Sequence, residues 1–221
     1  MSLGNTYSLQ VPAGSPLGAL LREATAAARE ERYEEAAQLQ KSALELGGSQ
    51  LLPVASVVLR LTLGSYQLHL AMATPARARE AAGTLESVIT RARALGMDWE
   101  TVQASLGLAT ARCLLGDNDA AANAYLAAAG IAKQTGEIEL AGEALRRAGD
   151  AYLNAGNRAL AVTRWRSALE LLSGVEIASD ELDDVAVVTK LRAFYEERGI
   201  DVAARHLDKV LDKLRLCRGR N

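Results

Sequence analysis

Residues 141–172 read AGEALRRAGDAYLNAGNRALAVTRWRSALELL. Small and apolar residues recur in this stretch every three or four positions, which is the spacing of one face of an α-helix. The pattern is interrupted at Ala155-Gly156-Asn157, where glycine and asparagine favour a turn. The stretch therefore predicts two helices that fold back on each other.

Small and large side chains have separate places in this stretch. Small ones stand where the two helices would cross closely, at Ala148, Gly149, Ala161 and Ala168. Large ones stand where gaps need filling, at Leu145, Tyr152, Leu160, Trp165 and Leu169. With Gly156 in the turn, this order resembles the tetratricopeptide repeat (TPR), with Leu145 for the first Trp of that motif and Trp165 for its Phe. At that place of the motif Trp165 is predicted to be a core residue.

The same unit recurs along the chain at a step longer than the roughly 34 residues usual for the family. It is clear again in residues 98–136, with Leu108, Ala109, Gly116 and Tyr125, and weaker in the two copies before it. The predicted repeats cover residues 17–50, 51–96, 98–136 and 137–174, followed by an atypical terminal pair at 179–217. Residues 1–16 are predicted to be a flexible lead, and residues 17–221 to be one repeat domain.

The fold class that the resemblance implies is all-α: a TPR-like α-solenoid of about five antiparallel helix pairs in a right-handed superhelix. The composition agrees with it. The chain is 49% hydrophobic but only 4% aromatic, and it has four prolines, so its core is expected to consist largely of Ala, Leu and Val on closely approaching helices. Each pair would bury its apolar face against its neighbours.

Charge and cysteine content exclude several classes of protein. A formal net charge of −2 provides no electrostatic footprint for nucleic acid or for a membrane surface. No apolar run approaches the roughly 20 residues that span a bilayer, so no membrane insertion is expected. Two cysteines are too few for a disulfide framework, which favours a reducing cytoplasm. The sequence has no Gly-rich phosphate loop, and no cofactor is expected to be bound.

In TPR proteins the first helix of each pair lines a concave groove. By resemblance, the groove residues of the third repeat are Gln103, Leu106 and Thr110. Those of the fourth repeat are Glu143, Arg146, Arg147, Asp150 and Asn154. Arg146 could bind a partner carboxylate with two hydrogen bonds. The alternative is an ordinary solvated helix face, on which Arg146 pairs with Asp150 four residues later.

An acidic segment offers a different chemistry. Asp180, Glu181, Asp183 and Asp184 could together hold Mg²⁺. The alternative is that these residues occupy the first turn of a helix, where the helix dipole favours negative charge. His69 and His206 have no metal-binding partner three or four residues away, so both are expected to be structural or surface residues.

The predicted function is that of a non-catalytic adaptor or scaffold, which binds a peptide or amphipathic helix of another protein in the groove. A chaperone or a regulatory module of a larger complex would fit this description. Two alternatives stay open at this stage. One is a small all-α metal-dependent enzyme that uses residues 180–184, and the other is a protein that self-assembles through its terminal repeats.

Overall fold

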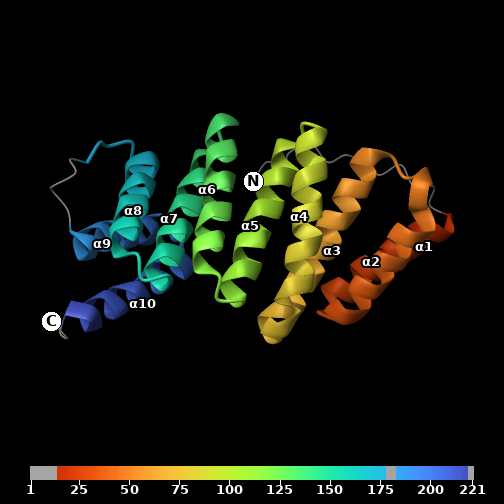
Figure 1. The fold of residues 1–221 in the computed structure, drawn as a ribbon, viewed down its shortest axis with the longest axis horizontal. Coiled ribbons are helices and arrows are strands. Elements are labelled where there is room, and N and C mark those ends of the chain that lie inside the picture. The colour runs from red at the N-terminus through yellow and green to blue at the C-terminus, as the bar shows by residue number, and fades with distance from the viewer. Residues whose placement is uncertain (1–13, 178–182, 219–221) are drawn as a thin grey trace. The chain divides into compact units, whose positions relative to one another are not determined.

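The computed structural model describes residues 14–177 and 183–218 and is built from helices (Figure 1). The described residues contain no strand, so the all-α prediction is confirmed. Two short 3₁₀ turns, at Gly48–Gln50 and Pro75–Arg77, lie between α-helices. The α-helices are α1 (Pro16–Arg29), α2 (Tyr33–Gly47), α3 (Pro53–Ala73), α4 (Ala78–Ala94), α5 (Asp98–Leu114), α6 (Asn118–Gln134), α7 (Ile138–Asn154), α8 (Arg158–Ser173), α9 (Asp184–Glu197) and α10 (Asp201–Arg218).

The chain divides into two compact units, one ending at Ala124 and the other beginning at Tyr125, so that the boundary lies inside α6. In the first unit α1 packs against α2, α2 against α3, α3 against α4, and α4 against α5. In the second, α7 packs against α8, α8 against α9, and α9 against α10. The predicted repeat bounds stay a prediction, as does one domain over 17–221 with a flexible lead over 1–16.

The turn between α7 and α8 explains why Gly156 stands where it does. Gly156 has φ 82°, a left-handed conformation that suits glycine, and the amide of Asn157 donates to the carbonyl of Tyr152 over 2.8 Å. This arrangement closes the end of a helix and reverses the chain. The turn between α1 and α2 has the same form, but Glu31 takes the left-handed place at φ 59°. The missing glycine is one reason why the first repeat is hard to recognise in the sequence.

Helices α7 and α8 approach each other closely at two glycines. A Cβ atom on Gly149 would lie 2.5 Å from Cδ1 of Trp165, and one on Gly142 would lie 2.4 Å from Cγ of Leu172. The two glycines are two helical turns apart and face the same neighbouring helix. Trp165 itself is fully buried, so its predicted place in the core is confirmed.

The core of each unit is rich in alanine, as the composition predicts. In the first unit Val57, Leu85 and Val88 are buried among alanines of α3, α4 and α5. In the second unit the residues buried in α7 and α8 are mainly small ones around Trp165. Helices α9 and α10 bring larger side chains, and those that are fully buried are Val187, Val188, Leu191, Leu207 and Leu214.

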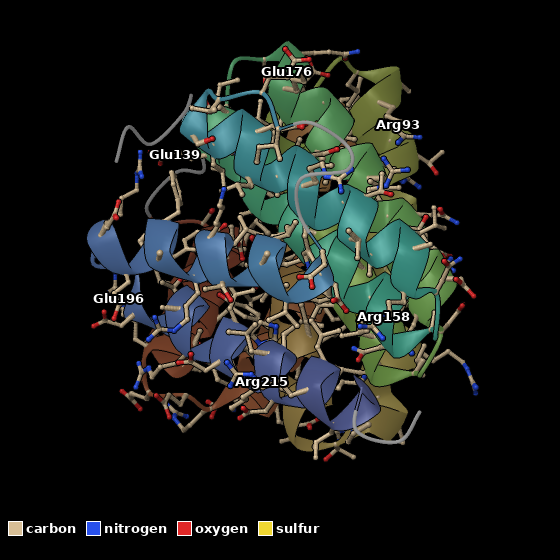
Figure 2. The ribbon with its side chains drawn as sticks, turned by 90° about the vertical axis from the view of Figure 1, so that its left-hand side faces the viewer. Arg93, Glu139, Arg158, Glu176, Glu196 and Arg215 are labelled. Carbon is tan, nitrogen blue, oxygen red and sulfur yellow. The ribbon has the colours of Figure 1, made fainter. Side chains whose placement is uncertain are left out.

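In the second unit α9 runs at an angle to α8, and α10 lies below α9 in the view of Figure 2. Figure 2 shows Arg158, in the first turn of α8, beside the beginning of α9, and Glu196 at the other end of α9. Of the terminal pair predicted at 179–217, residues 179–182 lie outside the described residues. The first helix of that pair begins at Asp184.

Gly149→Ala should lower the free energy of unfolding by about 1–3 kcal/mol, because the new methyl group would overlap the Trp165 ring and push α8 away from α7. Gly83→Ala is the control, since a Cβ atom at Gly83 in α4 meets nothing within 4 Å. That substitution should stabilise the protein by roughly 0.5–1 kcal/mol through helix propensity. Urea unfolding measures both values, and equal effects at the two glycines would contradict the close approach.

Candidate functional site

The three predicted residues of α5 lie on one partly exposed face of that helix. Gln103, Leu106 and Thr110 are each half-buried, at the three- and four-residue spacing that keeps side chains on one side of a helix. Val102 and Ala109 beside them are buried. The Thr110 hydroxyl donates to the Leu106 carbonyl over 3.1 Å. This face offers a leucine methyl surface flanked by an amide and a hydroxyl.

The five predicted residues of α7 include a buried arginine. Only 4% of Arg146 is exposed. Its Nε and Nη2 atoms donate to the two carboxylate oxygens of Glu143 over 2.8 Å and 2.6 Å, and its Nη1 atom donates to Asp150 Oδ2 over 2.6 Å. Arg147, on the more exposed side, adds a hydrogen bond of 2.7 Å from Nε to Glu143 Oε1. Arg146 is therefore held by two carboxylates of its own helix.

Three other helices contribute to the same cluster. On α8, the indole N–H of Trp165 donates to Asp150 Oδ1 over 3.0 Å. On α9, the hydroxyl of Tyr195 donates to Glu143 Oε2 over 2.9 Å, and its ring centroid lies 5.9 Å from the guanidinium carbon of Arg146.

Helix α10 adds two contacts to α7. The ring N–H of His206 donates to Asp150 Oδ2 over 2.9 Å, and Lys213 Nζ donates to Asn154 Oδ1 over 2.8 Å. The contacts from α9 and α10 thus reach Glu143, Asp150 and Asn154, which are three of the five predicted α7 residues. Helices α9 and α10 therefore cover part of the α7 face that sequence reasoning assigned to a partner, while Arg147 and Asn154 remain exposed.

Burial and charge together set the ionisation of this cluster. Burial alone would raise the pKa of Glu143, but the hydrogen bonds and positive charges of Arg146 and Arg147 outweigh it and lower that pKa to about 2. Burial, followed by the nearby Glu143 charge, raises the pKa of the Tyr195 hydroxyl. Burial would lower the pKa of Arg146, yet its two carboxylate partners raise it above the ordinary value. The cluster is therefore a fixed set of ion pairs and hydrogen bonds at neutral pH.

These contacts bear on the two interpretations of Arg146. The pairing of Arg146 with Asp150, four residues apart, is present. The solvated face that accompanied it in that interpretation is not found, because Arg146 is buried under contacts from α8 and α9. Partner binding through Gln103, Leu106, Thr110, Glu143, Arg146, Arg147, Asp150 and Asn154 stays a prediction.

Sequence reasoning did not place Tyr195, His206 or Lys213 in this cluster. They lie 52, 56 and 59 positions from the α7 residues that they contact. No motif marks the terminal helix pair, so nothing in the sequence indicates which face of α7 it covers. His69, the other histidine, stacks on Tyr33 with ring centroids 4.3 Å apart.

Two of the acidic residues considered for Mg²⁺ have structural roles. Asp183 caps α9, since its Oδ1 accepts from the Ala186 amide over 2.8 Å. Asp184 is 4% exposed and accepts from Nε of Arg158 over 2.6 Å. Both roles agree with the helix-start interpretation. Asp180 and Glu181 lie outside the described residues, and within residues 14–177 and 183–218 no three acidic, histidine or cysteine side chains form a possible metal site.

The comparisons with solved structures bear on the fold. The chain is similar to the TPR-like repeats of a putative kinesin light chain of Podosopora anserina: the crystal structure of a single-residue variant has a TM-score of 0.61 and 16% identity, over 96% of this chain and 100% of that one. A second crystal structure of those repeats matches with a TM-score of 0.61 and 16% identity, over 93% of this chain and 97% of that one. BtubC (BKLC) of P. vanneervenii matches with a TM-score of 0.58 and 15% identity, over 89% of this chain and 78% of that one.

These likenesses confirm the predicted TPR-like α-solenoid fold. No protein-family model matches the sequence, and no curated protein matches it. Within the described part of the chain, no helix is both long enough and apolar enough to cross a membrane.

Arg146→Ala should lower the free energy of unfolding by about 3–5 kcal/mol, because it leaves Glu143 and Asp150 partly buried without their cation. Arg147→Ala is the matched control on the same helix. The Arg147 side chain is 45% exposed, so its loss should cost less than about 1 kcal/mol. Urea unfolding followed by circular dichroism compares the two, and a similar loss in both would contradict the assigned role of Arg146.

The depressed pKa of Glu143 predicts a specific loss of stability in acid. A carboxyl whose pKa is about 2 in the folded state, against an ordinary 4.5, contributes its full stabilisation above about pH 4.5 and loses it as the pH falls through 2. The depression corresponds to on the order of 3 kcal/mol. Unfolding measured across this range should therefore show a steeper loss for the wild type than for Glu143→Gln, which has no charge to lose. Parallel curves would contradict the assignment.

Proposed function

We propose that this chain is a non-catalytic adaptor or scaffold that binds a peptide or an amphipathic helix of another protein in the groove lined by the first helices of its repeats. Two findings support the proposal. The fold is TPR-like, and folds of this kind typically mediate protein–protein interaction. The partly exposed face of α5 also places Leu106 beside the polar side chains of Gln103 and Thr110.

The α5 face is the observation that carries the proposal. Helix recognition relies on apolar anchors at three- and four-residue spacing with polar groups beside them. Leu106 supplies the apolar contact, and the side-chain amide of Gln103 can both donate and accept hydrogen bonds. The α7 residues have the corresponding places in the next repeat, but their polar atoms are engaged by α8, α9 and α10. On this proposal the first contact of a partner is with α5.

The wider context belongs to the same proposal. A chaperone or a regulatory module of a larger complex would use such a face, and the low cysteine content favours the cytoplasm as the compartment. A second copy of this chain, bound through the terminal repeats to form a homo-oligomer, would be a further protein partner. Light scattering across protein concentration would detect it as a rise in mass.

Leu106→Asp should abolish partner capture, because a central apolar anchor contributes about 2 kcal/mol or more to an interface, which is roughly a thirtyfold change in affinity. Affinity capture with the full chain as bait, followed by quantitative mass spectrometry, makes the comparison. Leu46→Asp is the control, since Leu46 lies on α2 and is 53% exposed.

The expected result is a set of proteins retained by the wild type and by Leu46→Asp but lost with Leu106→Asp. Thermal unfolding of both variants checks that they remain folded. Capture of the same proteins by all three chains would reject the α5 face as the binding surface.

A further inference from the structure

The contacts between the terminal helix pair and α7 have a distinct character. They include three hydrogen bonds between side chains: Tyr195 to Glu143, His206 to Asp150, and Lys213 to Asn154. We call these three contacts the latch. His206 is 48% exposed and Lys213 is also exposed, so water competes for both hydrogen bonds. Two of the three contacts of the latch are therefore open to water, while the third is made by Tyr195, which is buried.

The terminal pair has a separate source of stability. Helices α9 and α10 pack on each other, and Leu191 of α9 and Leu207 and Leu214 of α10 are fully buried. The first turn of α9 is also tied to α8, because the buried carboxylate of Asp184 pairs with Arg158. Asp184 is the first residue of α9, and Figure 2 shows its partner Arg158 beside that end of the helix. Tyr195, in contrast, belongs to the last turn of α9. The pair can keep its own packing and its attachment at Asp184 while the latch opens.

Opening the latch would make three acceptors on α7 available to donors of another helix. Glu143, Asp150 and Asn154 would each lose a hydrogen-bond donor, while Arg146 would stay between its two carboxylates. The donors that these atoms now accept from are a phenol, an imidazole and an ammonium group. A helix with such donors on its polar side and leucine or valine on its apolar side has the chemistry that fits this face.

We propose that the α7 face is a second partner-binding surface, that its ligand is an amphipathic helix with His, Lys or Tyr donors, and that the α9–α10 pair is the intramolecular competitor for it. This inference rests on the proposed function, since it supposes that the chain binds helices of other proteins. A competitor in the same chain acts at an effective concentration on the order of millimolar. The apparent affinity for a partner is then reduced by the fraction of molecules whose latch is open.

A peptide with the sequence of residues 201–216, DVAARHLDKVLDKLRL, is the probe, because it reproduces the donors of α10. Fluorescence anisotropy measures its binding to the full chain. The latch variant, Tyr195→Phe/His206→Ala/Lys213→Met, should bind the peptide at least ten times more tightly than the wild type. The control variant, Arg205→Ala/Lys209→Met, changes exposed cations on the same helix and should bind as the wild type does.

Hydrogen exchange shows whether the latch has opened. In the latch variant the amides of α10 should exchange faster than in the wild type, while those of α8 should be unchanged. Adding Asn154→Ala to the latch variant, or replacing the histidine and second lysine of the peptide by alanine, should reverse the gain in affinity.

Two results would overturn the inference. One is unchanged protection of α10 in the latch variant, and the other is faster exchange of α10 without tighter peptide binding. Partner capture that depends on Leu106 is a separate outcome. If that capture is observed while the peptide fails to bind, only the second surface is rejected, and the proposed function stands.

Discussion

The close approach of α8 to α7 at Gly149 is the constraint on which the second unit depends. Without a side chain at this position, the Trp165 ring lies against α7 and its indole N–H reaches Asp150. Asp150 in turn holds one side of the Arg146 guanidinium, and Glu143 holds the other. A packing requirement in the core thus determines the geometry of a charged cluster, because the same indole ring fills the space between the helices and fixes a carboxylate.

Burying Arg146 is costly, and the surroundings show how the cost is offset. A cation removed from water loses more than a single ion pair returns, so a buried arginine needs several well-placed acceptors. Arg146 has two carboxylates, and each of these accepts a further donor from another helix, Tyr195 or Trp165. The result is a network in which the loss of one member leaves the others unsatisfied. Such a network specifies how α7, α8 and α9 meet, which an alanine-rich core alone would specify poorly.

The sequence could predict what depends on local pattern. The helices on either side of Gly156, the buried place of Trp165 and the pairing of Arg146 with Asp150 all follow from spacings within one repeat. The covering of α7 does not, because it depends on α9 and α10, whose residues match no repeat motif. Tyr195 meets Glu143 across 52 positions, and only the folded chain brings them together. For this reason the α7 residues looked like a free polar surface in the sequence.

The difference between α5 and α7 follows from the residues at matching places of their repeats. Gln103, Leu106 and Thr110 are neutral, and they remain half-exposed on α5. Their counterparts Glu143, Arg146 and Asp150 are charged, and charges at helical spacing pair with one another before they pair with a ligand. Once paired, they form a surface that can accept hydrogen bonds from a helix with matching donors. Helix α10 is such a helix, with His206 and Lys213 as its donors. The charge pattern of α7 thus accounts both for its internal network and for the chemistry of whatever covers it.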